Sequence, residues 1–127
     1  MLANLSCFDP LHPQIYFNGA YVPALAEQHK ESVNPATLAL VGRYPLCGQA
    51  DVERTVTAAN QAQKQWKSTD TQSRAALLHS VAHAIENSAI RSELAQLICR
   101  EMGKPYPDAV GELSICASVF RYYAEMA

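Results

Sequence analysis

The sequence predicts an α+β chain in which short strands and a hairpin occupy the first third and four helices follow. Three observations lead to this prediction. An Asn18-Gly19 pair stands between two short runs of β-forming residues. Turn residues punctuate the chain as far as Pro45, and from about residue 49 onwards apolar residues recur at spacings of three and four.

The chain is expected to begin with an arm and a hairpin. Residues 1–14 contain two prolines and no periodicity, which indicates a loose N-terminal arm. Residues 15–17 and 20–22 are β-forming, and Asn18-Gly19 lies between them. A type I′ turn needs positive φ at both central positions, which asparagine and glycine tolerate. We therefore predict two short strands joined at Asn18-Gly19.

A turn and one further strand are expected next. The polar stretch 27–31 has no strand pattern. Asn34-Pro35 favours a turn, because proline fixes φ and asparagine can accept a hydrogen bond from the backbone two residues on. Residues 38–44 are then predicted to form a strand that ends at Pro45, because proline cannot donate to a ladder.

Four helices are expected, near residues 49–66, 70–88, 90–102 and 106–126. Asp51 suits the dipole in the first turn of the first helix, and Thr69-x-x-Gln72 matches a capping box that opens the second. Gly103 and Pro105 are typical residues for ending the third. The apolar stripe expected on the first helix, spaced by threes and fours, consists of Val52, Val56, Ala59, Ala62 or Gln63, and Trp66.

The fourth helix has no ending signal. Its pattern continues through residues 120–127 without glycine, asparagine or proline. We therefore expect the chain to be part of a longer protein. Two alternatives stay open, a self-contained helical binding module and an inactive truncated remnant.

The residues alone indicate no active site. His79 and His83 lie one helical turn apart but on the face opposite the apolar stripe, so a solvated face is a better interpretation than a metal pair. The cysteines are Cys7, Cys47, Cys99 and Cys116. They lack the spacing of zinc ligands, and no motif of an activated nucleophile surrounds them. The five glycines form no phosphate-binding loop.

Composition and charge narrow the functional class. The chain has 127 residues, of which 49% are hydrophobic and 17% charged, and its net charge is −2. This composition is typical of a globular domain, and the charge gives no reason to bind nucleic acid or an anionic membrane. The chain has neither an apolar run that could span a bilayer nor a secretory signal pattern. We expect a cytoplasmic protein.

Six pieces of sequence, in order, suggest a family. They are Ile15-x-x-Asn18-Gly19-x-Tyr21-Val22, Val33-Asn34-Pro35-Ala36-Thr37, Ala50-Asp51-Val52-Glu53, Trp66, Arg74-Ala75-x-Leu77-Leu78 and Arg100-Glu101-Met102-Gly103-Lys104-Pro105. In this order and spacing they resemble the start of the aldehyde dehydrogenase superfamily over residues 15–127. One departure is Leu38, where the family has glycine. Leucine disfavours positive φ, so we expect a remodelled turn there.

The resemblance implies an α/β parent fold, in which residues 15–127 form the N-terminal part of the cofactor-binding domain, incomplete. Such enzymes oxidise a small-molecule aldehyde to a carboxylic acid with NAD or NADP, through a cysteine thiohemiacetal and thioester. In the family that cysteine, the glutamate that activates water and the cofactor loop lie beyond this stretch. The resemblance therefore assigns no catalytic or cofactor-binding residue here, and the 127-residue chain is predicted to be inactive. It also implies a homo-oligomeric parent, a dimer or tetramer.

Two secondary sites follow from matching positions. In some relatives the fourth helix lines the substrate tunnel, which implies Glu112 and Ile115, and less strongly Cys116 and Val119, as tunnel residues. Ordinary helix packing is the alternative for each. Some relatives also hold a structural monovalent cation near the Asn-Pro turn and the end of the third helix. The matching groups are the Val33 carbonyl and Glu101, although a solvated acid is the alternative for Glu101.

Overall fold

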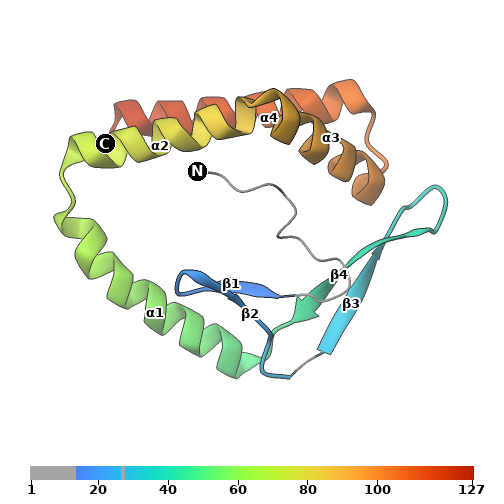
Figure 1. The fold of residues 1–127 in the computed structure, drawn as a ribbon, viewed down its shortest axis with the longest axis horizontal. Helices are drawn as coiled ribbons and strands as arrows, with labels where there is room; N and C mark the ends of the chain where they lie inside the picture. Colours follow the sequence, from blue (N-terminus) through green and yellow to red (C-terminus); the bar gives the residue numbers. More distant parts are fainter. Residues whose placement is uncertain (1–13, 27) are drawn as a thin grey trace. The chain divides into compact units, whose positions relative to one another are not determined.

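The computed structural model describes residues 14–26 and 28–127, which form two compact units. Residues 14–26, 28–33 and 39–68 make up a hairpin unit, and residues 34–38 and 69–127 make up a helical unit. Within these described residues, four strands precede four helices (Figure 1). The predicted α+β order is confirmed, whereas the predicted N-terminal arm lies almost entirely outside the described residues.

The hairpin unit begins with the predicted hairpin. Strands β1 (Ile15–Phe17) and β2 (Ala20–Val22) are antiparallel, with Phe17 opposite Ala20. Asn18 has a φ of 50° and Gly19 a φ of 84°, so both central residues take the positive values that the turn requires.

A second antiparallel pair contains a strand that the sequence pattern did not predict. Strand β3 (Gln28–Val33) pairs with β4 (Leu40–Leu46). The polar β3 has no apolar alternation, so its pairing with β4 is what makes it a strand. Strand β4 also runs through Pro45 rather than ending there, with Pro45 opposite His29. In the described sheet β4 has β3 as its neighbour and a free outer edge, where a proline is tolerated.

The turn between β3 and β4 has a left-handed residue at Leu38. The Asn34 Oδ1 accepts hydrogen bonds from the backbone N–H groups of Ala36 and Thr37, at 2.9 and 3.1 Å, as predicted for an Asn-Pro turn. Leu38 itself adopts a φ of 58°, so the expected remodelling is wrong. Its side chain is 76% exposed, so no burial offsets the strain of this left-handed conformation.

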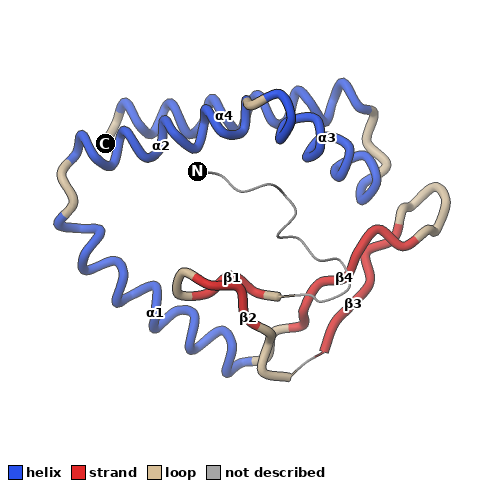
Figure 2. Tube along the Cα trace, viewed as in Figure 1, coloured by secondary structure: helices blue, strands red, loops and turns tan. Residues whose placement is uncertain are grey.

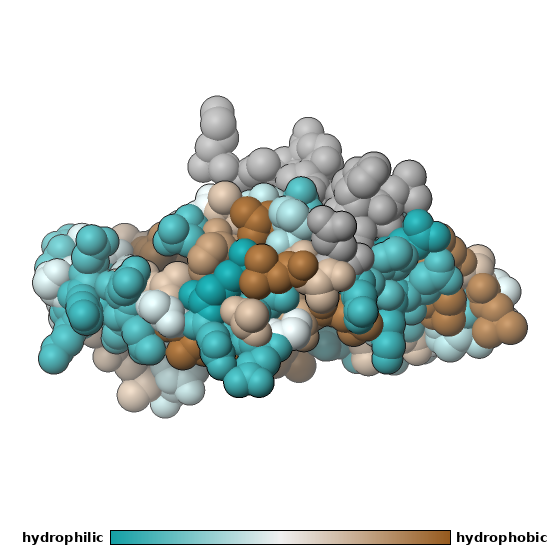
Figure 3. Space-filling model, turned by 90° about the horizontal axis from the view of Figure 1, so that it is seen from below, coloured by the Kyte–Doolittle hydropathy of each residue, from teal (hydrophilic) through white to brown (hydrophobic). Residues whose placement is uncertain are grey.

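Helix α1 (Gln49–Ser68) is the last element of the hairpin unit. The apolar stripe of this helix is exposed. Val52 and Val56 are each more than half exposed, and Trp66 is 38% exposed. Asp51 is the one residue of α1 that is buried. Within the described residues the predicted apolar stripe of this helix is therefore largely exposed. Figure 3 shows that hydrophobic side chains reach the surface among hydrophilic ones.

The helical unit contains α2 (Thr71–Glu86), α3 (Ser88–Met102) and α4 (Tyr106–Glu125). Asp70, not Thr69, is the N-cap of α2, and its carboxylate accepts a hydrogen bond from the Ser73 N–H at 2.8 Å. The predicted capping box from Thr69 to Gln72 is therefore wrong, and the helix is capped one residue later by Asp70. The Gly103 cap of α3 is confirmed, with a φ of 69°.

Small side chains dominate the core of the helical unit. Helices α2 and α4 lie side by side (Figure 2). Close packing of the three helices is possible because alanines are buried at position 82 of α2, position 95 of α3 and positions 109, 117 and 124 of α4. Among the described residues Leu113 is the largest apolar residue that is buried, and it forms a cluster with Ala95 and Ala109. Burial of such a leucine contributes about 1.5–3 kcal/mol to the free energy of unfolding. In the described part of the chain, no helix is both long and apolar enough to cross a membrane.

Candidate functional site

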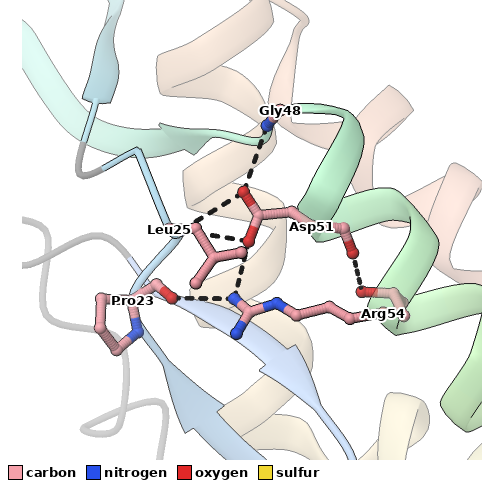
Figure 4. Close-up of polar contacts among 6 residues, drawn as sticks. Pro23, Leu25, Gly48, Asp51 and Arg54 are labelled. Atoms are coloured by element: carbon pink, nitrogen blue, oxygen red, sulfur yellow. Dashed lines mark hydrogen bonds and ion pairs between the residues drawn. The ribbon is translucent and has the colours of Figure 1, made fainter.

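The Asp51 carboxylate, in the first turn of α1, lies at the centre of a hydrogen-bond network in the hairpin unit (Figure 4). It accepts hydrogen bonds from the Leu25 N–H at 3.1 Å and from the Gly48 N–H at 3.2 Å. Arg54 Nη2 donates a further one at 2.7 Å. Asp51 is only 2% exposed. Because the bond to Gly48 satisfies an N–H that precedes the helix, Asp51 acts as one half of a capping box.

This environment keeps Asp51 ionised. Burial raises the pKa of the carboxyl, but the backbone hydrogen bonds from Leu25 and Gly48 and the charge of Arg54 together hold it below its usual value. A carboxylate with a low pKa and fully engaged oxygens is a poor general base. Its role in the structure is to fix the segment after β2 onto the start of α1.

Arg54 extends this network to the hairpin. Its guanidinium donates to the Pro23 carbonyl at 3.1 Å and lies 5.1 Å from the centre of the Phe17 ring. Its Nε is buried and has no partner among the described residues. The sequence pattern indicated only that Asp51 suits the helix dipole. The spacing Gly48-x-x-Asp51 followed by Arg54 is the local signal that could have indicated the capping role.

A pocket of about 270 Å³ lies beside this network. It is lined by Ile15, Tyr16, Cys47, Asp51, Val52, Thr55 and Val56. The lining is mainly apolar, and Cys47 is an exposed free thiol. The carboxylate that lines this pocket is the fully bonded Asp51, so the pocket presents no group suited to activating a nucleophile.

The predicted tunnel residues lie along α4. Glu112 is half-buried and forms an ion pair with Lys104. The hydrogen bond that Lys104 donates to this carboxylate raises the pKa of Lys104 above its usual value. Ile115 is 67% exposed, and Val119 and Cys116 are also exposed. Glu112 and Ile115 are three residues apart in α4 and so lie on the same side of the helix, with Ile115 the more exposed. Their assignment to a tunnel stays a prediction.

The predicted cation ligands are Val33 in β3 and Glu101 at the end of α3. They belong to different units, so the cation site also stays a prediction. Within the helical unit, Pro35 packs against Gly103, where an added Cβ would lie 3.1 Å from the Pro35 Cγ. The Asn-Pro turn that follows Val33 therefore contacts the residue that ends α3, two positions after Glu101.

His79 and His83 are both exposed, as predicted. The Nε2 of His79 lies 3.2 Å from Oε1 of Glu125 on α4, which gives it a role between helices. A second ion pair between the same two helices joins Glu86 of α2 to Arg121 of α4. In the described residues, no three His, Cys, Asp or Glu side chains come together as possible metal ligands.

Comparison with known proteins gives a consistent family. The model of the aldehyde dehydrogenase family matches residues 21–127. A 3-sulfolactaldehyde dehydrogenase from Pseudomonas putida is 38% identical over 122 residues, which cover 94% of this chain and 24% of the relative.

Solved structures share the fold. The chain aligns with PnpE in complex with nicotinamide adenine dinucleotide at a TM-score of 0.84 and 32% identity. It aligns with an NADP-dependent glyceraldehyde-3-phosphate dehydrogenase from Bacillus halodurans, complexed with NADP, at 0.85 and 29%. Each alignment covers 91% of this chain and 24% of the neighbour. The chain thus spans about a quarter of the length of the proteins it matches.

Proposed function

Because the chain belongs to the aldehyde dehydrogenase family, we propose that it supplies the N-terminal part of an enzyme that oxidises an aldehyde to a carboxylic acid with NAD or NADP. The observation that carries the proposal is the family match over residues 21–127. Related structures that hold NAD and NADP support the choice of cofactor.

In this proposal residues 15–127 belong to the cofactor-binding domain and act as its scaffold. The networks around Asp51 and around Gly103 fix local elements, and neither offers a nucleophile, an oxyanion site or a phosphate loop. The cysteine and the glutamate of the chemistry would come from the rest of the enzyme. An oligomeric parent in the cytoplasm is part of the same proposal.

The tunnel and cation assignments are carried as proposals within this function. Lys104 neutralises Glu112, so Glu112 would present a paired carboxylate to a substrate rather than a free charge. Ile115, exposed on α4, would supply an apolar wall. The Val33 carbonyl and Glu101 offer the oxygen ligands that a hard cation prefers.

A chimeric enzyme tests the proposal. The matching 122-residue stretch of the 3-sulfolactaldehyde dehydrogenase is replaced by the corresponding part of this chain. We expect a folded chimera that reduces NAD or NADP with the aldehyde, because the chemistry resides in the unchanged remainder. A second chimera with Leu113→Asp, which places a charge in the helical core, should be inactive. A first chimera that is folded and binds cofactor yet oxidises no aldehyde would contradict the scaffold role.

A further inference from the structure

The turn between β1 and β2 requires a residue pair that is also chemically labile. Asn18 and Gly19 both have positive φ, and both are exposed. A Cβ built at Gly19 would meet no atom within 4 Å, so the surroundings of the turn leave room for the backbone to move. Glycine also gives this position more conformational freedom than any other residue would.

An asparagine followed by glycine can cyclise without any other reactant. The Gly19 nitrogen attacks the side-chain Cγ of Asn18, so an N–Cγ bond forms and the bond from Cγ to the amide nitrogen breaks. That nitrogen leaves as ammonia, taking up the proton lost by the Gly19 N–H. Water then opens the cyclic imide at one of its two carbonyls, which gives aspartate or isoaspartate. No oxidation or reduction takes place.

The structure leaves the attacking nitrogen of Gly19 accessible. Within residues 14–26 and 28–127, no acceptor takes a hydrogen bond from the Gly19 N–H. The flanking strands have three residues each, and an isolated two-stranded hairpin is only marginally stable. Opening of the hairpin therefore gives the turn ready access to the geometry of attack.

The other described asparagines are protected in ways that the structure explains. Asn34 precedes Pro35, whose nitrogen carries no hydrogen, and its side-chain oxygen is bonded to the turn. Asn60 lies inside α1, where helical hydrogen bonding restrains the next nitrogen. Asn87 caps α3, and its side-chain oxygen accepts a hydrogen bond from the Ala89 N–H at 3.2 Å.

We propose that Asn18 is a site of spontaneous deamidation, at which the hairpin converts with time to aspartyl and isoaspartyl forms. Isoaspartate adds a methylene group to the backbone between Phe17 and Ala20, the pair that closes the turn. The added length disturbs the edge-to-face contact of Tyr16 and Tyr21, whose ring centres are 5.1 Å apart. It also displaces Phe17 from Arg54, so modification loosens the hairpin from α1.

Peptide mass spectrometry of the aged 127-residue chain tests the proposal. The protein is incubated at mildly alkaline pH in water enriched in heavy oxygen, and samples are digested at intervals. We expect residue 18 to lose its amide and gain labelled oxygen at least about tenfold faster than Asn34, Asn60 or Asn87, with isoaspartate exceeding aspartate.

Two variants separate chemistry from unfolding. Asn18→Asp keeps the normal backbone and should retain the protection of the Phe17 and Ala20 amides, the pair that closes the turn, from hydrogen exchange, whereas the aged protein should lose it. Asn18→Gln should stop the labelling at residue 18. If residue 18 reacts no faster than Asn60, or if the aged protein keeps its amide protection despite full conversion, the proposal is wrong.

Discussion

The contact between Pro35 and Gly103 gives the sharpest prediction about stability. Gly103 caps α3 with a φ of 69°, and an added Cβ would lie 3.1 Å from the Pro35 Cγ. The substitution Gly103→Ala therefore has two costs. Left-handed backbone costs a residue with a Cβ roughly 1–2 kcal/mol, and the close approach requires Pro35 to shift by a few tenths of an ångström.

We expect Gly103→Ala to lower the free energy of unfolding by about 1–3 kcal/mol, which is the sum of the backbone strain and a small packing change. Urea unfolding followed by far-UV circular dichroism measures it. Gly111→Ala is the matched control, since Gly111 lies inside α4 and a Cβ there meets nothing within 4 Å. It should raise stability by about 0.5–1 kcal/mol, because alanine favours helix.

A further variant distinguishes strain from contact. Asparagine tolerates left-handed backbone, so Gly103→Asn should lose less than Gly103→Ala if strain dominates, and more if the contact with Pro35 dominates. The reasoning would be refuted if Gly103→Ala were as stable as the wild type while Gly111→Ala were stabilised. In that case neither the Gly103 cap nor its contact with Pro35 would stabilise the helical unit.

Four other perturbations test the local arguments. Leu38→Gly should raise stability by about 1 kcal/mol in urea unfolding, because it relieves left-handed strain at an exposed side chain; no gain would contradict this. Leu113→Ala should lower the free energy of unfolding by about 2–5 kcal/mol in the same assay, and an unchanged free energy would contradict the burial of Leu113 in the core. Asn87→Ala should lower the free energy of unfolding by about 1 kcal/mol, because the N-cap of α3 is lost. A thermal melt with an unchanged midpoint would contradict this. The pKa of Asp51 is lowered in the folded state, so its stabilisation is present above pH 3.8 and lost as pH falls through the lower folded value. Asp51→Asn should flatten that acid dependence of stability, and an unchanged dependence would count against the network.

The elements predicted from the sequence are those that local chemistry specifies. Asn18-Gly19 identified the hairpin because few residue pairs accept two positive φ values. The helices were found because their spacing of apolar residues and their caps are local, and Gly103 marked the end of α3.

The missed features depend on partners distant in sequence or on choices between equivalent neighbours. The polar β3 is a strand because β4 pairs with it. Asp51 receives its key hydrogen bond from Leu25, 26 residues earlier, which no local pattern indicates. Asp70 and Thr69 are both good caps, and only the backbone geometry selects Asp70.

The candidate site shows the same division. Sequence resemblance identified the family, which the family match confirms. The residues themselves, apart from the resemblance, indicated no motif of an activated nucleophile. The sequence could not indicate that Lys104 pairs with Glu112, since that contact depends on how the residues before α4 fold back along it.

The most direct test of the central claim, that the chemistry lies outside this chain, is the rate at which the purified 127-residue protein reduces NAD or NADP with a panel of aliphatic and aromatic aldehydes. We expect no more reduced cofactor than in buffer without protein. Sustained formation of reduced cofactor that scales with protein concentration and disappears after heating would contradict it.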